Sequence, residues 1–241
     1  MDWFEEWFDT PYYHILYNNR DYNEAELFIS KLTTYLELPE HAKVVDLACG
    51  KGRHSIYLNK LGFNVLGLDL SHQSVEYDQQ FEDEHLKFLV HDMRNPLPIQ
   101  DADAVLNLFT SFGYFETEQE DLNVFESVHH GLKQGGVFVL DYLNREFVEH
   151  GIVESYDEVR GDITFHIHKK IENNYVIKEI NFSDKGKDYK FFERVKLHTS
   201  DKINEYAEKC GFERLKIWGD YVLNDFDPHT SSRCINLFRK K

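Results

Sequence analysis

The most informative shortage in this sequence is positive charge. Its 241 residues include 27 Lys and Arg against 43 Asp and Glu, which gives a formal net charge of −16. Nucleic-acid-binding proteins need a Lys and Arg surface that displaces counterions from phosphates. The only basic cluster here is the terminal Arg239-Lys240-Lys241, which we interpret as a solvated tail. The composition therefore disfavours DNA or RNA as a partner.

Cysteines and long apolar runs are also scarce. Cys49, Cys210 and Cys234 are too few and too scattered for a disulfide framework or a CxxC metal site, which indicates a reducing compartment. No apolar run approaches the roughly 20 residues of a membrane span. The stretch Met1 to Asp9 is acidic and aromatic, whereas a secretory leader is basic and then apolar. We expect a soluble, cytoplasmic protein that does not contact a membrane.

Aromatic residues are abundant instead. They make up 15% of the chain, with 19 Phe and 14 Tyr. A chain of this length folds as one domain with room for a buried sheet. The surplus of rings predicts an aromatic-lined cavity in addition to a packed core.

Short apolar runs alternate with helical patterns along the first two thirds of the chain. The predicted strands are Lys43 to Ala48, Asn64 to Asp69, Leu86 to His91, Ala102 to Phe109 and Val137 to Tyr142. The predicted helices between them are Arg53 to Lys60, Gln73 to Gln80 and Gln119 to Leu132. Continuous apolar strands indicate parallel βαβ units. Because such crossovers are right-handed, the fold class is α/β, a doubly wound sheet with ligands at the carboxyl ends of its strands.

The segment Gly161 to Leu197 has a different pattern, with polar and apolar residues alternating between short turns. This predicts an antiparallel meander after the fifth strand. A helix from Ser200 to Cys210 and strands at Leu215 to Tyr221 and Arg233 to Phe238 complete the chain. We therefore expect a single domain over residues 1–241 with an antiparallel β insertion over 156–199. The meander either roofs a pocket or pairs with another subunit in a homodimer.

Residues 1–40 form a separate N-terminal segment. A helix is expected from about Asn23 to Leu36, and aromatic residues crowd Trp3 to Tyr17. Two interpretations stay open for this aromatic stretch. It packs permanently on the sheet, or it closes over the ligand crevice as a lid that excludes water.

The first strand ends in a motif that carries chemistry. Asp46 is followed by Gly50 and Gly52, which let the backbone approach a ligand closely. The fingerprint of a dinucleotide site needs a third glycine, but Arg53-His54-Ser55 occupies that stretch. A carboxylate at Asp46 would repel a diphosphate and attract a cation such as a sulfonium or an ammonium.

Acidic residues also close the next two strands. Asp69 can accept hydrogen bonds from both ribose hydroxyls of a nucleoside. In His91-Asp92-Met93, the carboxylate can accept from an exocyclic amine and the thioether can cover an adenine face. Three acidic residues at successive strand ends indicate one ligand more strongly than any of them alone.

These motifs identify a resemblance. The segments VVDLACGKG, GLDLS, HDM and LKQGGVFVLD resemble successive motifs of class I S-adenosylmethionine-dependent methyltransferases. The resemblance implies the seven-stranded, Rossmann-like sheet of that family, S-adenosyl-L-methionine as cofactor, and residues 107–110 near the transferring methyl group. The cofactor-binding residues that we assign are Asp46, Ala48, Gly50, Gly52, Asp69, Leu70, His91, Asp92, Met93, Asn107 and Tyr17.

The acceptor is defined less sharply. The meander and the stretch Asp225 to Arg233 are similar to small-molecule N-methyltransferases, such as amino-sugar dimethyltransferases and glycine methyltransferases. This suggests a small-molecule acceptor, an amine in preference to a hydroxyl, because a hydroxyl needs a general base. A methyltransferase acting on tRNA or protein and a non-catalytic or NAD-type nucleotide-binding protein stay as alternatives.

Several side chains are candidates for contact with the acceptor. The catalytic candidates are His14, Tyr13 and Tyr114, and Tyr17, Tyr142 and Asn144 are further candidates. The pairs His129-His130 and His166 with His168 lack a third ligand at recognisable spacing, so we expect no metal.

Overall fold

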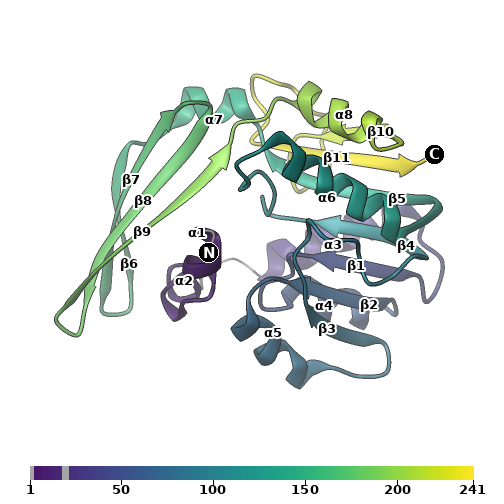
Figure 1. Ribbon diagram of the computed structural model, residues 1–241, viewed down its shortest axis with the longest axis horizontal. Helices are drawn as coiled ribbons and strands as arrows, with labels where there is room; N and C mark the ends of the chain where they lie inside the picture. Colours follow the sequence, from purple (N-terminus) through teal and green to yellow (C-terminus); the bar gives the residue numbers. More distant parts are fainter. Residues whose placement is uncertain (1–2, 18–21) are drawn as a thin grey trace.

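The computed structural model describes residues 3–17 and 22–241, and these form two sheets (Figure 1). The main sheet has seven strands in the order β10-β11-β5-β4-β1-β2-β3, and the second has four in the order β6-β7-β8-β9. The main strands are β1 (Lys43–Leu47), β2 (Asn64–Asp69), β3 (Leu86–Val90), β4 (Ala102–Asn107), β5 (Leu132–Leu143), β10 (Phe212–Trp218) and β11 (Arg233–Lys240).

The direction of the strands confirms the predicted doubly wound sheet. Strands β1 to β5 pair in parallel, whereas β11 is antiparallel to both β5 and β10. Successive βα units build outward from β1 to β3 on one side, and the chain then returns to β4 on the other side of β1. Ligands bind in such sheets where the winding direction reverses, which is here the carboxyl end of the boundary between β1 and β4.

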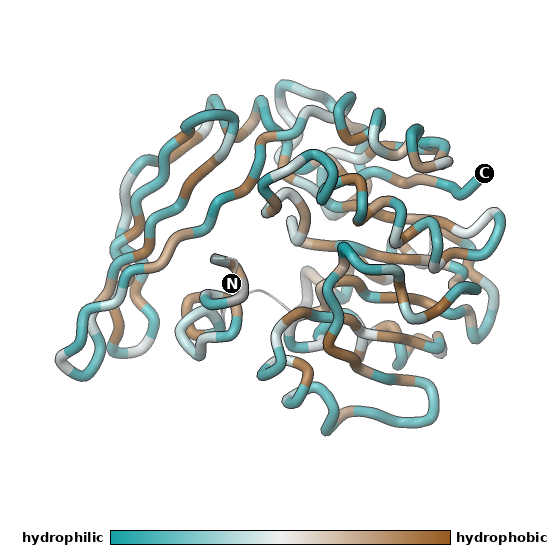
Figure 2. Tube along the Cα trace, viewed as in Figure 1, coloured by the Kyte–Doolittle hydropathy of each residue, from teal (hydrophilic) through white to brown (hydrophobic). Residues whose placement is uncertain are grey.

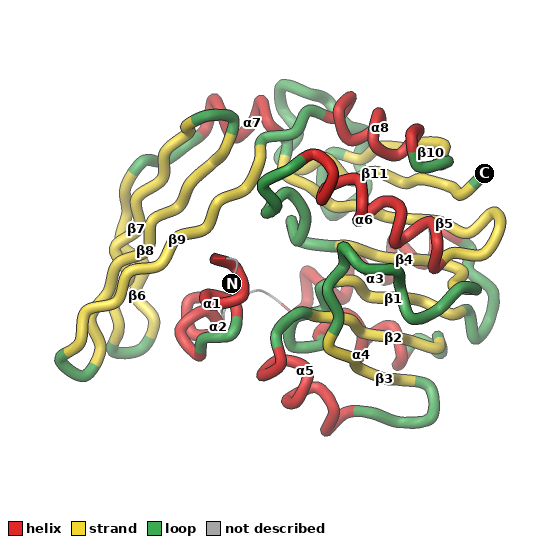
Figure 3. The backbone as a smooth tube through the Cα atoms, in the orientation of Figure 1, coloured by secondary structure: helices red, strands yellow, loops and turns green. Residues whose placement is uncertain are grey.

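Helices cover both faces of this sheet (Figure 3). One face packs against α6 (Glu118–Gly131) and α8 (Ser200–Lys209), and the other against α3 (Tyr22–Leu36), α4 (Arg53–Lys60) and α5 (His72–Asp78). Strand β1 is therefore buried on both faces. Its neighbouring residues Val44 and Val45 point to opposite faces and belong to different core clusters. A strand buried on both faces reads as a continuous apolar run, visible as brown stretches along β1 and β4 (Figure 2).

The antiparallel insertion is confirmed and is longer than the predicted meander. It consists of β6 (Ser155–Arg160), β7 (Ile163–Glu172), β8 (Tyr175–Asp184) and β9 (Lys187–Lys196). One face is apolar and buried, whereas the side chains of His166 and Ser155 on the opposite face are exposed. The alternation that predicted β7 to β9 is weaker in β6, where no side chain is fully buried.

The N-terminal aromatic stretch forms two short helices, α1 (Trp3–Phe8) and α2 (Pro11–Leu16), between the two sheets (Figure 1). Trp7 is fully buried against the insertion, and its Nε1 donates a hydrogen bond to Glu193 at 2.9 Å. Tyr17 also donates to Glu193, at 2.7 Å, and Tyr12 donates to Asp184 at 2.8 Å. The segment therefore packs mainly on the insertion, and not on the main sheet as one interpretation of the sequence had it.

Some predicted boundaries were wrong. Strand β5 was expected to begin at Val137, but α6 ends at Gly131 and β5 begins at Leu132. Gly135, with φ +74°, lies in an irregular part of the β4–β5 ladder. Helix α8 begins at Ser200 as predicted, and its N-cap is Thr199, whose side chain accepts from Lys202 N. Helix α7 (Arg145–Gly151), which leads into the insertion, was not predicted.

Among the residues that the structure describes, no helix combines the length and the apolar character needed to cross a bilayer.

A buried ionic cluster ties the insertion to the main sheet. Asp121 at the start of α6 is fully buried, with Lys196 Nζ of β9 at 2.6 Å and His198 Nε2 at 3.3 Å. Tyr142, also fully buried, donates to the Lys196 carbonyl. The strand that leaves the insertion is therefore held at the point where it returns to the core.

Replacing Lys196 with Met should lower the free energy of unfolding by about 3 kcal/mol or more, because Asp121 would keep a buried charge that has lost its closest cation. Urea denaturation followed by circular dichroism measures this. Lys43→Met removes a cation from an exposed pair with Asp101 and is the control, with an expected loss of about 1 kcal/mol or less. Adding Asp121→Asn should restore most of the loss. A Lys196→Met protein as stable as the unmodified one would contradict this account.

Candidate active site

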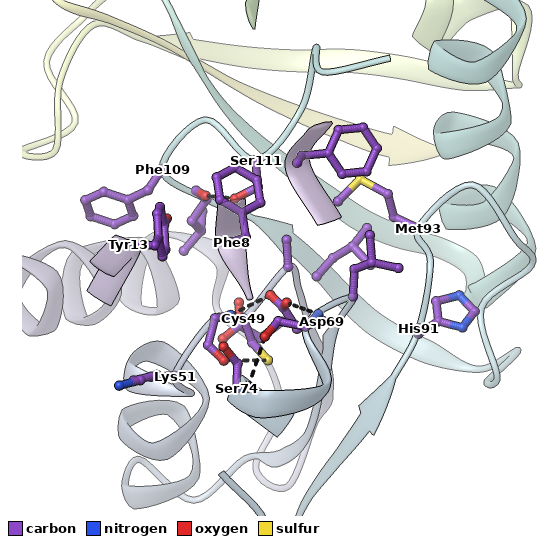
Figure 4. Close-up of a pocket in the computed structure, with 18 of the residues that line it drawn as sticks. Phe8, Tyr13, Cys49, Lys51, Asp69, Ser74, His91, Met93, Phe109 and Ser111 are labelled. Carbon is purple, nitrogen blue, oxygen red and sulfur yellow. Dashed lines mark hydrogen bonds between the residues drawn. The ribbon is translucent and has the colours of Figure 1, made fainter. Parts of the chain in front are cut away.

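A cavity of about 400 Å³ opens at the carboxyl ends of β1, β2, β3 and β4. Figure 4 shows Phe8, Tyr13 and Phe109 on one side of it, His91 on the other, and Asp69 and Cys49 at its floor. The lining residues are Phe4, Phe8, Tyr13, His14, Tyr17, Asp46, Leu47, Ala48, Cys49, Gly50, Lys51, Arg53, His54, Asp69, Leu70, Ser71, Ser74, Tyr77, His91, Asp92, Met93, Leu108, Phe109, Ser111, Tyr114 and Phe115.

The turn after β1 has three left-handed residues, Ala48 (φ +63°), Gly50 (φ +58°) and Gly52 (φ +63°). A Cβ placed on Gly50 would meet nothing within 4 Å, so this glycine borders open space. A Cβ on Gly52 would lie 2.9 Å from the Phe88 ring and 3.1 Å from Asp78 Cγ. Gly50 therefore exposes backbone to the cavity, whereas Gly52, which does not line the cavity, lets the turn pack on β3 and α5.

Asp46 lies at the end of β1 with 1% of its surface exposed. Ser55 of α4 donates a hydrogen bond to its Oδ2 at 2.6 Å. Burial raises the pKa of Asp46 to about 6. The hydrogen bond from Ser55 opposes this rise, and the negative charge of Asp69 adds to it. A positively charged ligand would relieve this cost of keeping a carboxylate away from water.

Asp69, at the end of β2, braces the glycine turn. Its Oδ2 accepts from Gly50 N at 2.8 Å, and its Oδ1 accepts from Ser71 N at 2.8 Å. Burial raises the pKa of Asp69, and these backbone donors oppose that rise. A carboxylate has about four acceptor sites, so Asp69 can hold the turn and still accept from a ligand.

Asp92 lies at the cavity beyond the end of β3, with His91 and Met93 beside it. Burial opposes its ionisation, but Arg94 outweighs this effect and lowers the pKa of Asp92. Arg94 Nη2 donates to Asp92 at 2.7 Å and Arg94 Nη1 to Glu120 at 2.8 Å. The sequence analysis missed this clamp, which fixes the orientation of the Asp92 carboxylate.

The loop after β4 holds two consecutive non-glycine residues in the left-handed region, Phe109 (φ +59°) and Thr110 (φ +61°). Such residues cost about 1 to 3 kcal/mol each and persist where the surroundings fix them. Asp141 accepts from Phe109 N at 2.7 Å, and Arg233 bonds both Asp141, at 2.7 Å, and Thr110 Oγ1, at 2.6 Å. Asn107 is fully buried beneath this loop and donates to the Leu47 carbonyl at 2.9 Å, so it does not line the cavity.

One wall of the cavity is a stack of rings. Phe109 stacks on His54 at 5.0 Å and on Tyr221 at 4.8 Å between centroids. The Arg53 guanidinium lies 5.1 Å from the Phe109 ring centre. His54 is 8% exposed and borders the cavity.

Helices α1 and α2 also border the cavity, through the rings of Phe4, Phe8 and Tyr13. The ring centroids of Phe8 and Tyr13 lie 4.9 Å apart, and those of Tyr13 and Tyr17 are separated by the same distance. Burial, with a contribution from Lys51, lowers the pKa of His14 to about 4 despite the nearby Asp9. His14 is therefore a neutral imidazole at pH 7.

Asp9, between α1 and α2, reaches across to the first turn of α5. Its Oδ1 accepts from Ser71 Oγ at 2.7 Å and from Gln73 N at 3.1 Å. This contact links the N-terminal helices to the rim of the cavity next to Asp69.

Three further residues, Tyr114, Tyr142 and Asn144, were candidates for contact with the acceptor, and of these Tyr114 borders the cavity. Tyr114 lines the cavity and donates to the Thr110 carbonyl. Tyr142 is in the core, and Asn144 donates to the carbonyls of Pro228 and Ser231. Neither side chain borders the cavity.

Other residues that border the cavity were not predicted from the sequence: Lys51, Arg53, Ser74, Tyr77 and Ser111. The sequence did offer a signal for four of them, because each lies within a few residues of the glycine turn or of Asp69: Lys51, Arg53, Ser74 and Tyr77.

Within residues 3–17 and 22–241, no group of three His, Cys, Asp or Glu side chains is arranged to hold a metal ion.

Comparison with known proteins matches residues 44–136 to a family described as a methyltransferase domain. An N,N-dimethyltransferase of Streptomyces venezuelae, named for dTDP-3-amino-3,4,6-trideoxy-α-D-glucopyranose, is 30% identical over 176 residues, 70% of this chain and 73% of that protein. The Bacillus subtilis protein YqeM, provisionally described as a methyltransferase, is 27% identical over 213 residues, 84% of this chain and 85% of its own.

Among solved structures, an S-adenosylmethionine-dependent methyltransferase from Clostridium acetobutylicum superposes with a TM-score of 0.80. It is 19% identical, and the match covers 95% of this chain and 96% of that one. The chain therefore belongs to the class I methyltransferases, and its cofactor is S-adenosylmethionine.

Proposed function

We propose that this enzyme methylates an amine on a small molecule. The observation that carries the proposal is the aromatic cavity of about 400 Å³, enclosed between the ends of the parallel strands and the helices α1 and α2. Small-molecule sites have volumes of roughly 300 to 1,000 Å³ and mostly apolar walls with a few polar groups. A polymer such as tRNA would need an open, positively charged track, and the floor of this cavity is acidic.

The cavity fits the cofactor by its chemistry. S-adenosylmethionine carries a sulfonium and an ammonium, and the floor offers the buried carboxylate of Asp46 and the partly buried carboxylate of Asp69. Open space lies above Gly50, where a backbone cradle can receive the methionine moiety. The fit leaves Gly52 and Asn107 as supports beneath the site and not as contacts.

We assign the pieces of the cofactor to separate strand ends. Gly50 and Ala48, with Asp46 beneath them, would hold the methionine moiety, and Asp69 with Leu70 would hold the ribose. Asp92, His91 and Met93 would hold the adenine, because Arg94 leaves Asp92 oriented as an acceptor. Tyr17 borders the same cavity from the N-terminal side.

The bound cofactor supplies an electrophilic methyl group for in-line displacement. The protein's own contribution is to exclude water and to hold the acceptor in line. The rings of Phe8, Tyr13, Tyr114 and Phe109 border the cavity and suit an amine, since aromatic faces attract cations. His14 is neutral at pH 7, so its ring nitrogen can accept a hydrogen bond from an amine N–H and help to orient the acceptor.

The names of relatives support an amine acceptor in preference to a hydroxyl. The Streptomyces relative is named as an N,N-dimethyltransferase of an amino sugar, and a glycine/sarcosine N-methyltransferase of Aphanothece halophytica is 27% identical over 90% of this chain. Both names describe methyl transfer to the nitrogen of a small molecule.

Purified enzyme with radiolabelled cofactor should label a pool of small primary and secondary amines, including amino sugars and amino acids. Hydroxy acids, neutral sugars, bulk tRNA and a protein mixture serve as parallel acceptors. Label in tRNA or protein, with none in the amine pool, would overturn the proposal. A thermal-shift comparison of S-adenosylhomocysteine with NAD provides a check on folding and cofactor preference, since only a ligand of the native state raises stability.

Asp69→Ala should weaken the binding of S-adenosylhomocysteine about tenfold or more, because hydrogen bonds to a charged acceptor contribute roughly 1.5 to 3 kcal/mol. Isothermal titration calorimetry measures the dissociation constant. Asp188→Ala, at the exposed start of β9, is the control and should leave the constant unchanged. Equal affinity in Asp69→Ala and the unmodified enzyme would remove Asp69 from the cofactor site.

We also propose that α1 and α2 act as a lid, with Asp9 as its latch on α5. Trp7 is fully buried on the insertion, so removing the whole segment would expose an apolar surface. A point change at the latch tests the idea more cleanly than a truncation.

Asp9→Ala should speed the dissociation of S-adenosylhomocysteine roughly three- to tenfold, because two hydrogen bonds that close the segment are lost. Stopped-flow displacement, followed by tryptophan fluorescence, measures the rate. Glu6→Ala changes an exposed acid on α1 and is the matched control. If Asp9→Ala releases the ligand as slowly as Glu6→Ala does, the latch has no role in retaining it.

A further inference from the structure

A third buried carboxylate lies below the glycine turn, and the assigned contacts do not use it. Asp78, the last residue of α5, has no exposed surface. Among the residues that the structure describes, neither of its carboxylate oxygens has a hydrogen-bond partner. Burying an ionised carboxylate without a hydrogen-bond partner costs free energy, so the protonation state of Asp78 depends on the groups around it.

The groups that surround Asp78 come from β1, β2, β3 and the glycine turn. The Phe88 ring of β3 and the backbone of Gly52 enclose it, with Asp78 Cγ 3.1 Å from the point where a Gly52 Cβ would lie. The charged groups that act on it are Asp69 of β2, Asp46 of β1 and Lys51 of the turn. Cys49, also in the turn, is buried and acts as a neutral thiol.

These surroundings keep Asp78 protonated. Burial, together with the charges of Asp69 and Asp46 and against Lys51, raises the pKa of Asp78 to about 8. The pKa of Asp46 is lower, about 6. Between pH 7 and pH 8, Asp46 is therefore ionised, whereas Asp78 still holds a proton.

We propose that Asp78 is the charge sensor of the cofactor site: it releases its proton when a ligand with net positive charge binds above the glycine turn, and so favours S-adenosylmethionine over the uncharged product. The inference rests on the proposed placement of the cofactor in this cavity, and it is independent of the acceptor.

The charge balance follows from the chemistry of the two ligands. S-adenosylmethionine has one carboxylate, one ammonium and one sulfonium. It becomes S-adenosylhomocysteine when the acceptor forms a bond to the methyl carbon and the breaking C–S bond leaves its electron pair on sulfur, which is then a neutral thioether. The positive ligand lowers the cost of ionising Asp78, whose proton passes to the buffer. After transfer this positive charge is absent, Asp78 recovers a proton, and the product is held less tightly.

Sinefungin, a stable analogue with an ammonium in place of the sulfonium, is the cationic probe, and S-adenosylhomocysteine is the neutral probe. Calorimetric titrations at pH 7.5 in buffers of different ionisation enthalpy give the number of protons released. We expect release of about half a proton more with sinefungin than with S-adenosylhomocysteine, since a unit charge several ångströms away at the effective dielectric of a protein shifts a pKa by about one to two units.

Asp78→Asn keeps the shape of the side chain but cannot ionise, and it should abolish this excess release. It should also reduce the preference for sinefungin over S-adenosylhomocysteine by roughly three- to tenfold. Glu76→Gln removes an exposed acid from the same helix and should behave like the unmodified enzyme. Asp78→Ala, checked for folding by thermal melting, gives the same test if the asparagine variant does not fold.

The pH dependence has a defined sign. Because binding releases a proton, the affinity of the unmodified enzyme for sinefungin should rise with pH and level off above the pKa of Asp78 near 8. This rise should exceed that of Asp78→Asn. Equal proton release and equal pH profiles in the two proteins would overturn the inference while leaving the cofactor site intact. Failure of the unmodified enzyme to bind either probe would instead overturn the proposed site.

Discussion

The rest of the site depends on two carboxylates at the ends of parallel strands, Asp46, which is buried, and Asp69, which is partly buried. The glycine turn is built on them, since Asp69 accepts from Gly50 N and Asp46 accepts from Ser55 of the next helix. Holding such charges away from water is costly. On the proposed placement of the cofactor, its positive charge removes part of that cost, and this contributes to its affinity.

Much of the main sheet could be predicted from sequence because its signals are local. The runs that became β1 and β2 are apolar on both faces, and Ser71 caps α5 by accepting from Ser74 N. Asp46, Asp69 and Asp92 could be found because each lies at or next to the carboxyl end of a predicted strand. Arg94, Asp141 and Arg233 could not, because their roles arise from contacts between segments that are 26 to 123 residues apart.

The insertion and the N-terminal helices show a second limit of sequence analysis. Alternation predicted strands, but it could not show that Trp7 and Leu16 would fill the apolar face of the insertion. Each part alone leaves apolar surface exposed, and together they form a core separate from the two cores of the main sheet. Tertiary complementarity of this kind has no short-range signature, so α1 and α2 read as irregular.

The separateness of that third core has an evolutionary consequence. The helices that border the cavity are seated on the insertion, and the insertion is fastened to the sheet through Asp121, Lys196 and Tyr142. The carboxylates beneath the glycine turn belong to other strands altogether. On the proposed placement of cofactor and acceptor, substitutions within the insertion can therefore move α1 and α2 and reshape the space for the acceptor without disturbing the groups that hold the methyl donor. Such an arrangement allows one ancestral scaffold to diversify toward new acceptors through changes in a single segment of the chain.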